Sequence, residues 1–340
     1  MVAALKKHYL VWAFALTALL SLMIAVAAPQ SAFAEGDSAQ DSATESSATD
    51  AASADNGVTA YDFYITGKRI TSENAADVLG DGTVSYDANT NTLTFNGLNI
   101  NSRDLTYAVR IEDDVTLVLK GKNVINCEVV ALQIGIDRLS SETTITGSGS
   151  LECIATYNLA DALEINVAST LKLDKNFQGS LSATGANPVE MRRGNLIVQG
   201  GRLNASANGV RSALHASLYC SHSNFEITGG SVVVTNSNIW LSGSTFHMSG
   251  GRIEVTSTEA RPSIWGNCDR GTSPSILLER GVSIETPDHG YVWSSDDKQT
   301  STICAAGQIA GPNFANAARH VVIHGNDNST FKNWHSRLIL

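Results

Sequence analysis

Apolar and polar residues alternate through most of this chain, in short phrases that run into glycine and then resume. TLVLKGKNVINC (116–127), TTITGSGSLEC (143–153) and NLIVQGGRLNAS (195–206) show the pattern. A period of two places successive side chains on opposite faces of a strand, and Val, Ile and Thr favour strands. Each phrase therefore predicts two short strands that meet at a glycine corner. Because no helical periodicity separates the phrases, units of alternating strand and helix are excluded.

The phrase recurs from about residue 90 onward, at spacings of 21 to 30 residues. Its copies lie at 92–100, 116–127, 143–153, 170–183, 195–206, 224–235, 245–256 and 275–286. A third short apolar element accompanies the copies, as in AVRI (108–111), ALQI (131–134) and ALEI (162–165). Three strands per repeat are typical of a parallel β-helix, in which one repeat makes one coil and coils stack at about 4.8 Å.

Stacked coils place equivalent residues in columns, and the sequence contains such columns. Aligned on the glycine corner, one inward column holds Ile125, Leu151, Leu181, Leu203, Val232 and Ile253. The column two residues further along holds Cys127, Cys153, Ala183, Ala205, Val234 and Val255. Every member is apolar, and every member of the second column is compact, as the interior of a coil requires.

The first 34 residues have the features of a secretory signal. Lys6 and Lys7 precede an apolar stretch at 10–28, and residues 32–34 (AFA) fit a small-x-small cleavage site. The alternative is a retained transmembrane anchor, because the apolar stretch is close to the length that spans a bilayer. Either interpretation places the rest of the chain outside the cytoplasm.

The remaining chain divides by composition. Residues 35–57 are small, polar and acidic, which predicts a disordered linker. A β-helix exposes strand edges at both ends, so each end needs a cap. The expected order is a signal peptide at 1–34, a linker at 35–57, an N-terminal cap with a hairpin at 58–90, the parallel β-helix at 91–325, and a C-terminal tail or cap at 326–340.

The stretch YDFYITGKRITSENAADVLGDGTVSYDANTNTLTFNGLNI (61–100), followed by the coils, resembles secreted right-handed parallel β-helix surface proteins of Gram-positive bacteria. That group is described as carbohydrate-binding and pectate-lyase-like. The resemblance covers about residues 60–325. It implies an all-β, right-handed parallel β-helix of about eight to nine coils with a small N-terminal β cap. It also implies a repeat protein that faces extracellular glycans.

Charge narrows the classes of partner. The chain has 23 basic and 33 acidic residues, a formal charge of −10, and this balance argues against non-specific binding of nucleic acid, which depends on clustered Lys and Arg. No second apolar segment is present, so no membrane contact is expected apart from the signal segment. The expected partner is an extracellular polysaccharide, on a host or cell-wall surface.

The third strand of each coil carries the candidate binding residues. If its apolar members point inward, an outward column holds Arg110, Gln133, Glu164, Glu190, His215, Trp240, Trp265 and Trp293. Indole rings stack on the apolar faces of sugars and keep an N–H for a hydroxyl group. Trp240, Trp265, Trp293, His215 and Glu190 are therefore the predicted carbohydrate-binding residues. The alternative is that the tryptophans stack on one another under loops such as 267–274.

Glu164 and Glu190 open an enzymatic alternative. On adjacent coils their backbones stand about 4.8 Å apart, near the carboxyl separation of retaining glycosidases. They are the catalytic candidates for a polysaccharide lyase or hydrolase. The alternative is two solvated carboxylates without a catalytic role.

Aspartates at one corner suggest calcium as a possible cofactor. Asp113 and Asp114 follow one third strand, and Asp137 occupies the same corner one coil later. Hard oxygen ligands in a rigid corner suit Ca²⁺. The alternative is turn formation by Asp.

The five cysteines are Cys127, Cys153, Cys220, Cys268 and Cys304, and the odd count leaves at least one unpaired within the chain. Cys127 and Cys153 share an inward column, so either a disulfide between coils or two reduced core thiols is consistent with the sequence.

These observations together predict a secreted or cell-surface polysaccharide-binding protein without catalytic activity. One alternative is a polysaccharide lyase or hydrolase of pectate-lyase-like fold. The other is a structural or adhesive stalk that binds a host or neighbouring protein.

Overall fold

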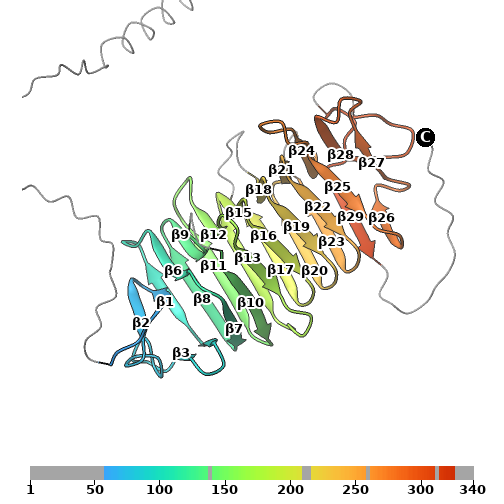
Figure 1. The fold of residues 1–340 in the computed structure, drawn as a ribbon. Helices are drawn as coiled ribbons and strands as arrows, with labels where there is room; N and C mark the ends of the chain where they lie inside the picture. The colour runs from blue at the N-terminus through green and yellow to red at the C-terminus, as the bar shows by residue number, and fades with distance from the viewer. Residues whose placement is uncertain (1–56, 137–139, 209–215, 258–260, 311–313, 326–340) are drawn as a thin grey trace, which may run out of the picture. The chain divides into compact units, whose positions relative to one another are not determined.

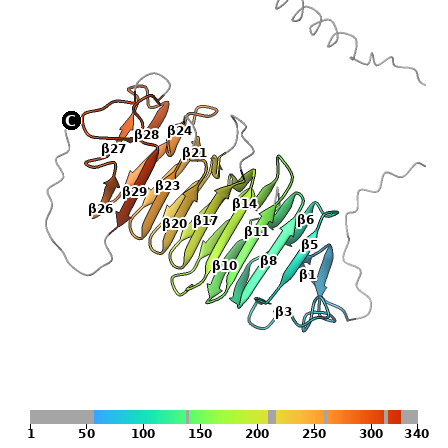
Figure 2. The ribbon, with the colours of Figure 1, turned by 180° about the vertical axis from the view of Figure 1, so that it is seen from behind.

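The computed structural model describes residues 57–136, 140–208, 216–257, 261–310 and 314–325. These residues are organised in three β-sheets, which Figures 1 and 2 show from opposite sides. Among them there is no α-helix, and none forms a helix long and apolar enough to cross a lipid bilayer. The predictions made for residues 1–56 and 326–340 lie outside the described residues.

Sheet A has eleven strands. In spatial order they are β2 (Lys68–Thr71), β1 (Ala60–Ile65), β6 (Tyr107–Ile111), β9 (Val130–Ile134), β12 (Asp161–Ile165), β15 (Asn187–Arg192), β18 (Leu218–Ser221), β21 (Ile239–Ser242), β24 (Ile264–Asn267), β28 (Thr300–Cys304) and β27 (Tyr291–Ser294). The strands from β6 to β24 are mutually parallel.

Sheet B has nine strands. In spatial order they are β25 (Ser275–Leu278), β22 (Thr245–Met248), β19 (Asn224–Ile227), β16 (Asn195–Val198), β13 (Thr170–Leu173), β10 (Glu142–Gly147), β7 (Val115–Lys120), β4 (Thr92–Asn96) and β3 (Val84–Asp87). All neighbours pair in parallel except β3 and β4, which form the antiparallel hairpin expected near the N-terminal end.

Sheet C also has nine strands. In spatial order they are β26 (Val282–Thr286), β29 (His320–Gly325), β23 (Arg252–Thr256), β20 (Ser231–Thr235), β17 (Arg202–Ala207), β14 (Ser180–Gly185), β11 (Ser150–Ala155), β8 (Lys122–Cys127) and β5 (Asn99–Ser102). The strands from β23 to β5 are mutually parallel.

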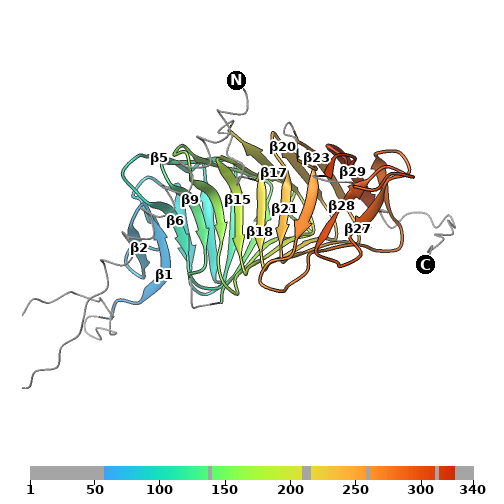
Figure 3. The same ribbon diagram turned by 90° about the horizontal axis from the view of Figure 1, so that it is seen from above.

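Each coil contributes one strand to each sheet in turn, as β7, β8 and β9 do, and the next coil repeats the path with β10, β11 and β12. Figure 3 shows the strands of successive coils side by side. The described residues thus form a parallel β-helix of about seven turns, fewer than the expected eight to nine. The difference arises after β25, where β28 pairs antiparallel with β24 and β29 antiparallel with β23. The last apolar phrases therefore reverse direction instead of adding coils.

The interior of the coils is apolar, as the columns predict. Leu151, Leu181, Leu203, Val232 and Ile253 follow one another in register, and all are fully buried. The first member of each predicted column is wrong. Ile125 faces Cys153 rather than Leu151, and Cys127 faces Ala155 rather than Cys153. The reason is the choice of glycine: Leu119 faces Gly147 and Lys122 faces Ser150, so Gly121 corresponds to Gly149 and not to Gly147.

The corrected register places Asn123 at the inward position opposite Leu151. Its amide is fully buried, accepts from the Leu98 N–H at 2.9 Å, and donates to the carbonyls of Lys120 and Ser150 at 3.1 and 2.9 Å. A polar residue is tolerated there because each of its bonds satisfies a backbone group at the corner. The same register separates the two cysteines, and all five cysteines are free thiols.

Glycine at the corners between sheets B and C is required by close backbone approach. A Cβ on Gly179 would lie 1.8 Å from the carbonyl oxygen of Gly149 in the preceding coil. A Cβ on Gly201, where φ is +60°, would lie 2.3 Å from the Phe177 ring. The recurring glycine of the phrase thus permits the coils to stack at strand spacing.

Candidate functional site

The outward column of sheet A brings together most of the residues that the sequence predicts for it. In register it runs through Arg110, Gln133, Glu164, Glu190, Tyr219, Trp240 and Trp265. Tyr219 stands where His215 is predicted, because the strand of that coil is Leu218–Ser221 rather than 213–216. Both segments alternate apolar and polar residues, and the loop before the strand is longer than the sequence alignment assumes. His215 itself lies outside the described residues.

Glu164 and Glu190 are adjacent, as predicted, but they are buried, with exposures of 4% and 8%. Arg192 binds both: its Nη1 is 2.9 Å from Glu164 Oε1, and its Nε is 2.7 Å from Glu190 Oε1. The Gln133 amide donates to Glu164 Oε2 at 2.8 Å. The nearby Asp161, 6% exposed, lies 3.6 Å from Arg192 Nη2. We call these five residues the acid–arginine cluster.

The acid–arginine cluster shifts the protonation of its members. Burial raises the pKa of Asp161 to about 9, and a hydrogen bond to Glu190 adds to the shift. The pKa of Arg192 is also raised, chiefly by its hydrogen bond to Glu190. Asp161 is therefore neutral near pH 7, so the cluster does not hold three charged carboxylates against one guanidinium. This arrangement links adjacent coils, and it engages both carboxylate oxygens of Glu164 and Oε1 of Glu190.

Trp240 and Trp265 also contact each other. Their rings stack with centroids 5.1 Å apart and an interplanar angle of 14°. The Arg261 guanidinium lies over both rings, at 5.6 and 5.5 Å. The Trp240 Nε1–H donates to Asn267 Oδ1 at 2.5 Å. The structure therefore displays the mutual stacking that was one of the two interpretations of these tryptophans.

The ends of this stack are also occupied by aromatic rings. Tyr219 lies 4.9 Å from Trp240, and Phe314 lies 5.5 Å from Trp265. Trp293 is not the next member of the column, which corrects the predicted strip of three. It faces Thr302 of β28, and Thr302 in turn faces Trp265, both in antiparallel pairing. Trp293 packs beside the small apolar cluster of Cys304, Ala310 and Ala317.

The aspartates proposed for calcium have other partners. The Asp114 carboxylate accepts from the Glu142 N–H at 2.7 Å, and the Asp113 carboxylate accepts from the Asp114 N–H at 2.8 Å. Asp137 lies outside the described residues. Within the described ranges, no group of three or more His, Cys, Asp or Glu side chains is arranged to hold a metal ion.

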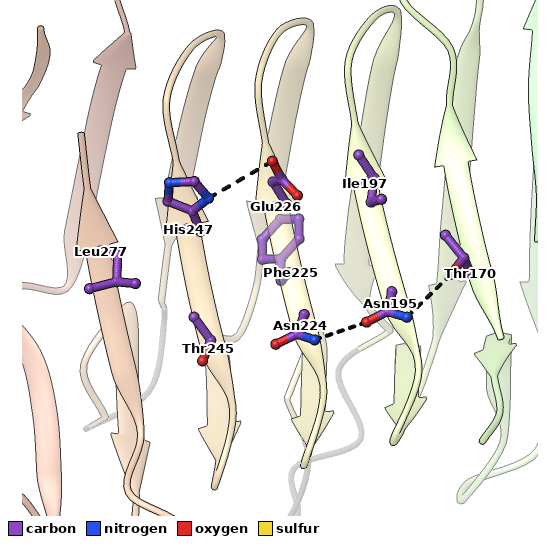
Figure 4. A pocket seen from close by; sticks show the side chains of 9 residues that line it. All are labelled: Thr170, Asn195, Ile197, Asn224, Phe225, Glu226, Thr245, His247 and Leu277. Atoms are coloured by element: carbon purple, nitrogen blue, oxygen red, sulfur yellow. Dashed lines mark hydrogen bonds and ion pairs between the residues drawn. The ribbon is translucent and has the colours of Figure 1, made fainter. Parts of the chain in front are cut away.

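The outer face of sheet B carries an open groove of about 330 Å³, shown in Figure 4, that the sequence analysis missed. A column of hydrogen-bonding side chains runs along it: Thr170, Asn195, Asn224 and Thr245, one from each of four coils. The Asn195 amide donates to Thr170 Oγ1 at 3.2 Å, and the Asn224 amide donates to Asn195 Oδ1 at 3.0 Å. We call this column the amide ladder.

A second column lies two residues further along each strand. It consists of Ile197, Glu226, His247 and Leu277. His247 Nε2 is 2.9 Å from Glu279 Oε1, and His247 Nδ1 is 3.8 Å from Glu226 Oε1. Leu277 is 51% exposed, so its apolar surface is accessible in the groove. The groove thus offers apolar patches beside amides, hydroxyls and a carboxylate.

Packing inside the coils holds the floor of this groove. Phe225, between the two columns on β19, is fully buried and stacks on Phe246 of the next coil, with ring centroids 5.2 Å apart. The signal for the groove was present in the sequence. Asn195, Asn224 and Thr245 each precede the first inward apolar residue of a repeat, and the same offset repeated three times marks an outward column.

Comparison of the chain with protein-family models, with curated proteins and with solved structures finds no match.

Proposed function

We propose that this protein is an extracellular polysaccharide-binding protein and that the groove of sheet B is its binding site. The observation that carries the proposal is the amide ladder, which places a hydrogen-bonding side chain, an amide or a hydroxyl, in each of four successive coils along an open groove. A polymer with a regular repeat is the ligand that a regular column of side chains fits best.

The chemistry of the groove suits sugars. Amide and hydroxyl groups both donate and accept, as sugar hydroxyls do. Asn195 and Asn224 each use part of their hydrogen-bonding capacity within the ladder, and two donors and an acceptor per amide leave capacity for a ligand. Ile197 and Leu277 supply apolar surface for the faces of sugar rings.

The direction of the ladder favours an extended chain that runs across the strands. Coils stack at about 4.8 Å, and one sugar unit of an extended polysaccharide advances by a similar distance. Each coil would then contact about one sugar unit. Glu226 in the groove and the formal charge of −10 disfavour strongly acidic polysaccharides at this site. We therefore expect an uncharged, extended glycan.

Two further features support binding outside the cell without cleavage. Residues 1–34 have the pattern of a secretory signal. The carboxylates that the sequence offered for catalysis, Glu164 and Glu190, are both engaged by Arg192.

A comparison of three variants in a glycan-array assay tests the proposal. Asn195→Ala/Asn224→Ala removes two amides from the ladder, each worth about 1 kcal/mol, so affinity for the bound glycan should fall by about tenfold or more. Asn204→Ala is the matched control, because Asn204 is also an outward amide that bonds to the preceding coil, at Ser182 Oγ at 3.0 Å, but it lies on sheet C. The affinity of the Asn204→Ala variant for the glycan should equal that of the unmodified protein.

The third variant, Trp265→Leu, tests the tryptophan site predicted from the sequence while keeping an apolar side chain at that position. Binding lost in Trp265→Leu and retained in the double Asn variant would move the site to sheet A. If the unmodified protein binds no glycan on the array, polysaccharide binding is rejected, and a structural or adhesive role takes its place.

A further inference from the structure

The corner between sheets B and C carries a second hollow, separate from the groove of sheet B. It measures about 570 Å³ and crosses the coils of β8, β11, β14 and β17. Its lining consists of three glycines, three serines, one glutamine and two basic residues: Gly121, Lys122, Ser148, Gly149, Ser150, Gln178, Gly179, Ser180 and Arg202. No carboxylate lines it, although acidic residues outnumber basic ones in the chain by 33 to 23.

The basic residues of this hollow have no acidic partner among the described residues. Lys122 and Arg202 are exposed and form no ion pair there, and the Arg202 Nε–H donates to the Asn204 amide oxygen at 2.7 Å. Lys120 and Lys175 stand at the same corner, because backbone atoms of each lie within 3 Å of the position that a Cβ would take on Gly149 and on Gly200. Two carboxylates stand near the corner: that of Asp174 accepts from the Asn176 N–H, and Glu152 lies two residues beyond Ser150 on β11, outside the lining of the hollow. The corner is therefore a cationic edge on an acidic protein.

Stacking sets the spacing of these charges. Lys122, Ser150, Ser180 and Arg202 follow one another in register, so Lys122 and Arg202 stand roughly 14 Å apart, three strand spacings. A linear polymer with repeated negative groups can contact both side chains at once without either having to lean toward the other. Between the two charges, serine hydroxyls and the Gln178 amide can donate hydrogen bonds.

We propose that this hollow binds a linear polymer of phosphodiester groups, laid along the corner from Lys122 to Arg202. A phosphodiester carries a full negative charge, and its tetrahedral oxygens accept from donors on two coils at once. Arg202 matches its oxygens with a planar fork, and Lys122 and the lysines of the edge act as point charges. The site is distinct from the groove of sheet B and holds independently of the function proposed for that groove.

Fluorescence anisotropy of the full chain with labelled poly(glycerol phosphate) tests the proposal. Lys122→Gln/Arg202→Gln should bind about tenfold more weakly than the unmodified protein, and binding should weaken as salt is added. The matched control is Arg270→Gln/Lys298→Gln, which removes the same charge from exposed residues elsewhere. Its affinity should stay unchanged, as should that of Asn195→Ala/Asn224→Ala.

Three outcomes overturn the proposal. The first is no detectable binding of poly(glycerol phosphate) by the unmodified protein. The second is an equal loss in the two charge variants, which would assign binding to net charge alone. The third is equal affinity for polygalacturonate with the same loss in Lys122→Gln/Arg202→Gln, which would show a site for negative charge of any kind rather than for phosphodiesters.

Discussion

The outer faces of sheets A and B have the same geometry, yet their side chains behave differently. On sheet A, acids meet Arg192 and indoles meet indoles, so neighbouring coils satisfy one another. On sheet B, amides and hydroxyls of one kind repeat, and the groove beside them stays open. Side chains whose contacts are used within the column thus close a face of a β-helix, whereas side chains that keep spare hydrogen-bonding groups leave it available to a ligand.

The strongest test of this contrast is Arg192→Met, which keeps an apolar stem and removes the cation of the acid–arginine cluster. Glu164 and Glu190 would then be buried without a counter-charge. Loss of one partner of a buried ion pair costs about 3 to 5 kcal/mol, and because Arg192 itself is half exposed we expect about 3 kcal/mol. Urea denaturation of the two proteins measures the difference.

Arg193→Met is the matched control for that variant, since Arg193 is the next residue, is exposed and has no ion pair among the described residues. Its free energy of unfolding should change by about 0.5 kcal/mol or less. Equal effects of the two substitutions would mean that the acid–arginine cluster contributes nothing specific to stability. The contrast between sheet A and sheet B would then be rejected.

The protonation of Asp161 gives a pH-dependent test of the same cluster. Its pKa is about 9 in the folded protein against 3.8 ordinarily, so the folded state binds this proton more tightly than the unfolded chain does. The stability contributed by the proton is complete below about pH 4 and is lost progressively as the pH rises toward 9. The slope for one proton is at most about 1.4 kcal/mol per pH unit, and we expect about 1.

Asp161→Asn should remove that slope, so its stability relative to the unmodified protein should increase between pH 5 and pH 8. Thermal denaturation across this range measures the change. Asp296→Asn, an exposed residue of the same type, should leave the slope as it is. A slope that survives in Asp161→Asn would assign the pH dependence to another group.

Burial explains which parts of this arrangement the sequence predicts. The inward columns from Leu151 and Cys153 onward and the adjacency of Glu164 and Glu190 are correct, because an apolar interior enforces a period of two. The position of Tyr219 is missed, because residues 213–216 and 218–221 both alternate, and the pattern does not show how many residues precede the strand. The contact of Arg192 with both glutamates depends on how its side chain folds back, which no periodicity encodes.

The end of the β-helix is missed for a related reason. Strands that add a coil and strands that reverse direction have the same alternation, so the phrase at 300–304 is no guide to its antiparallel pairing with β24. The groove of sheet B could have been found, because its amides keep one offset in consecutive repeats. Outward residues of successive repeats should therefore be aligned in columns in the same way as inward residues.

The smallest expected effect on stability comes from a change in the amide ladder, and it tests the contrast between sheets A and B most directly. Asn224→Ala removes the bond to Asn195 on an exposed face, where water replaces the lost partner. We expect the free energy of unfolding to fall by about 0.5 kcal/mol or less, measured by urea denaturation beside Arg192→Met. A loss comparable to that of Arg192→Met would mean that the amide ladder is there to join coils. A stable Asn224→Ala protein is what a column kept for a ligand requires, because its hydrogen bonds are then worth more to the complex than to the fold.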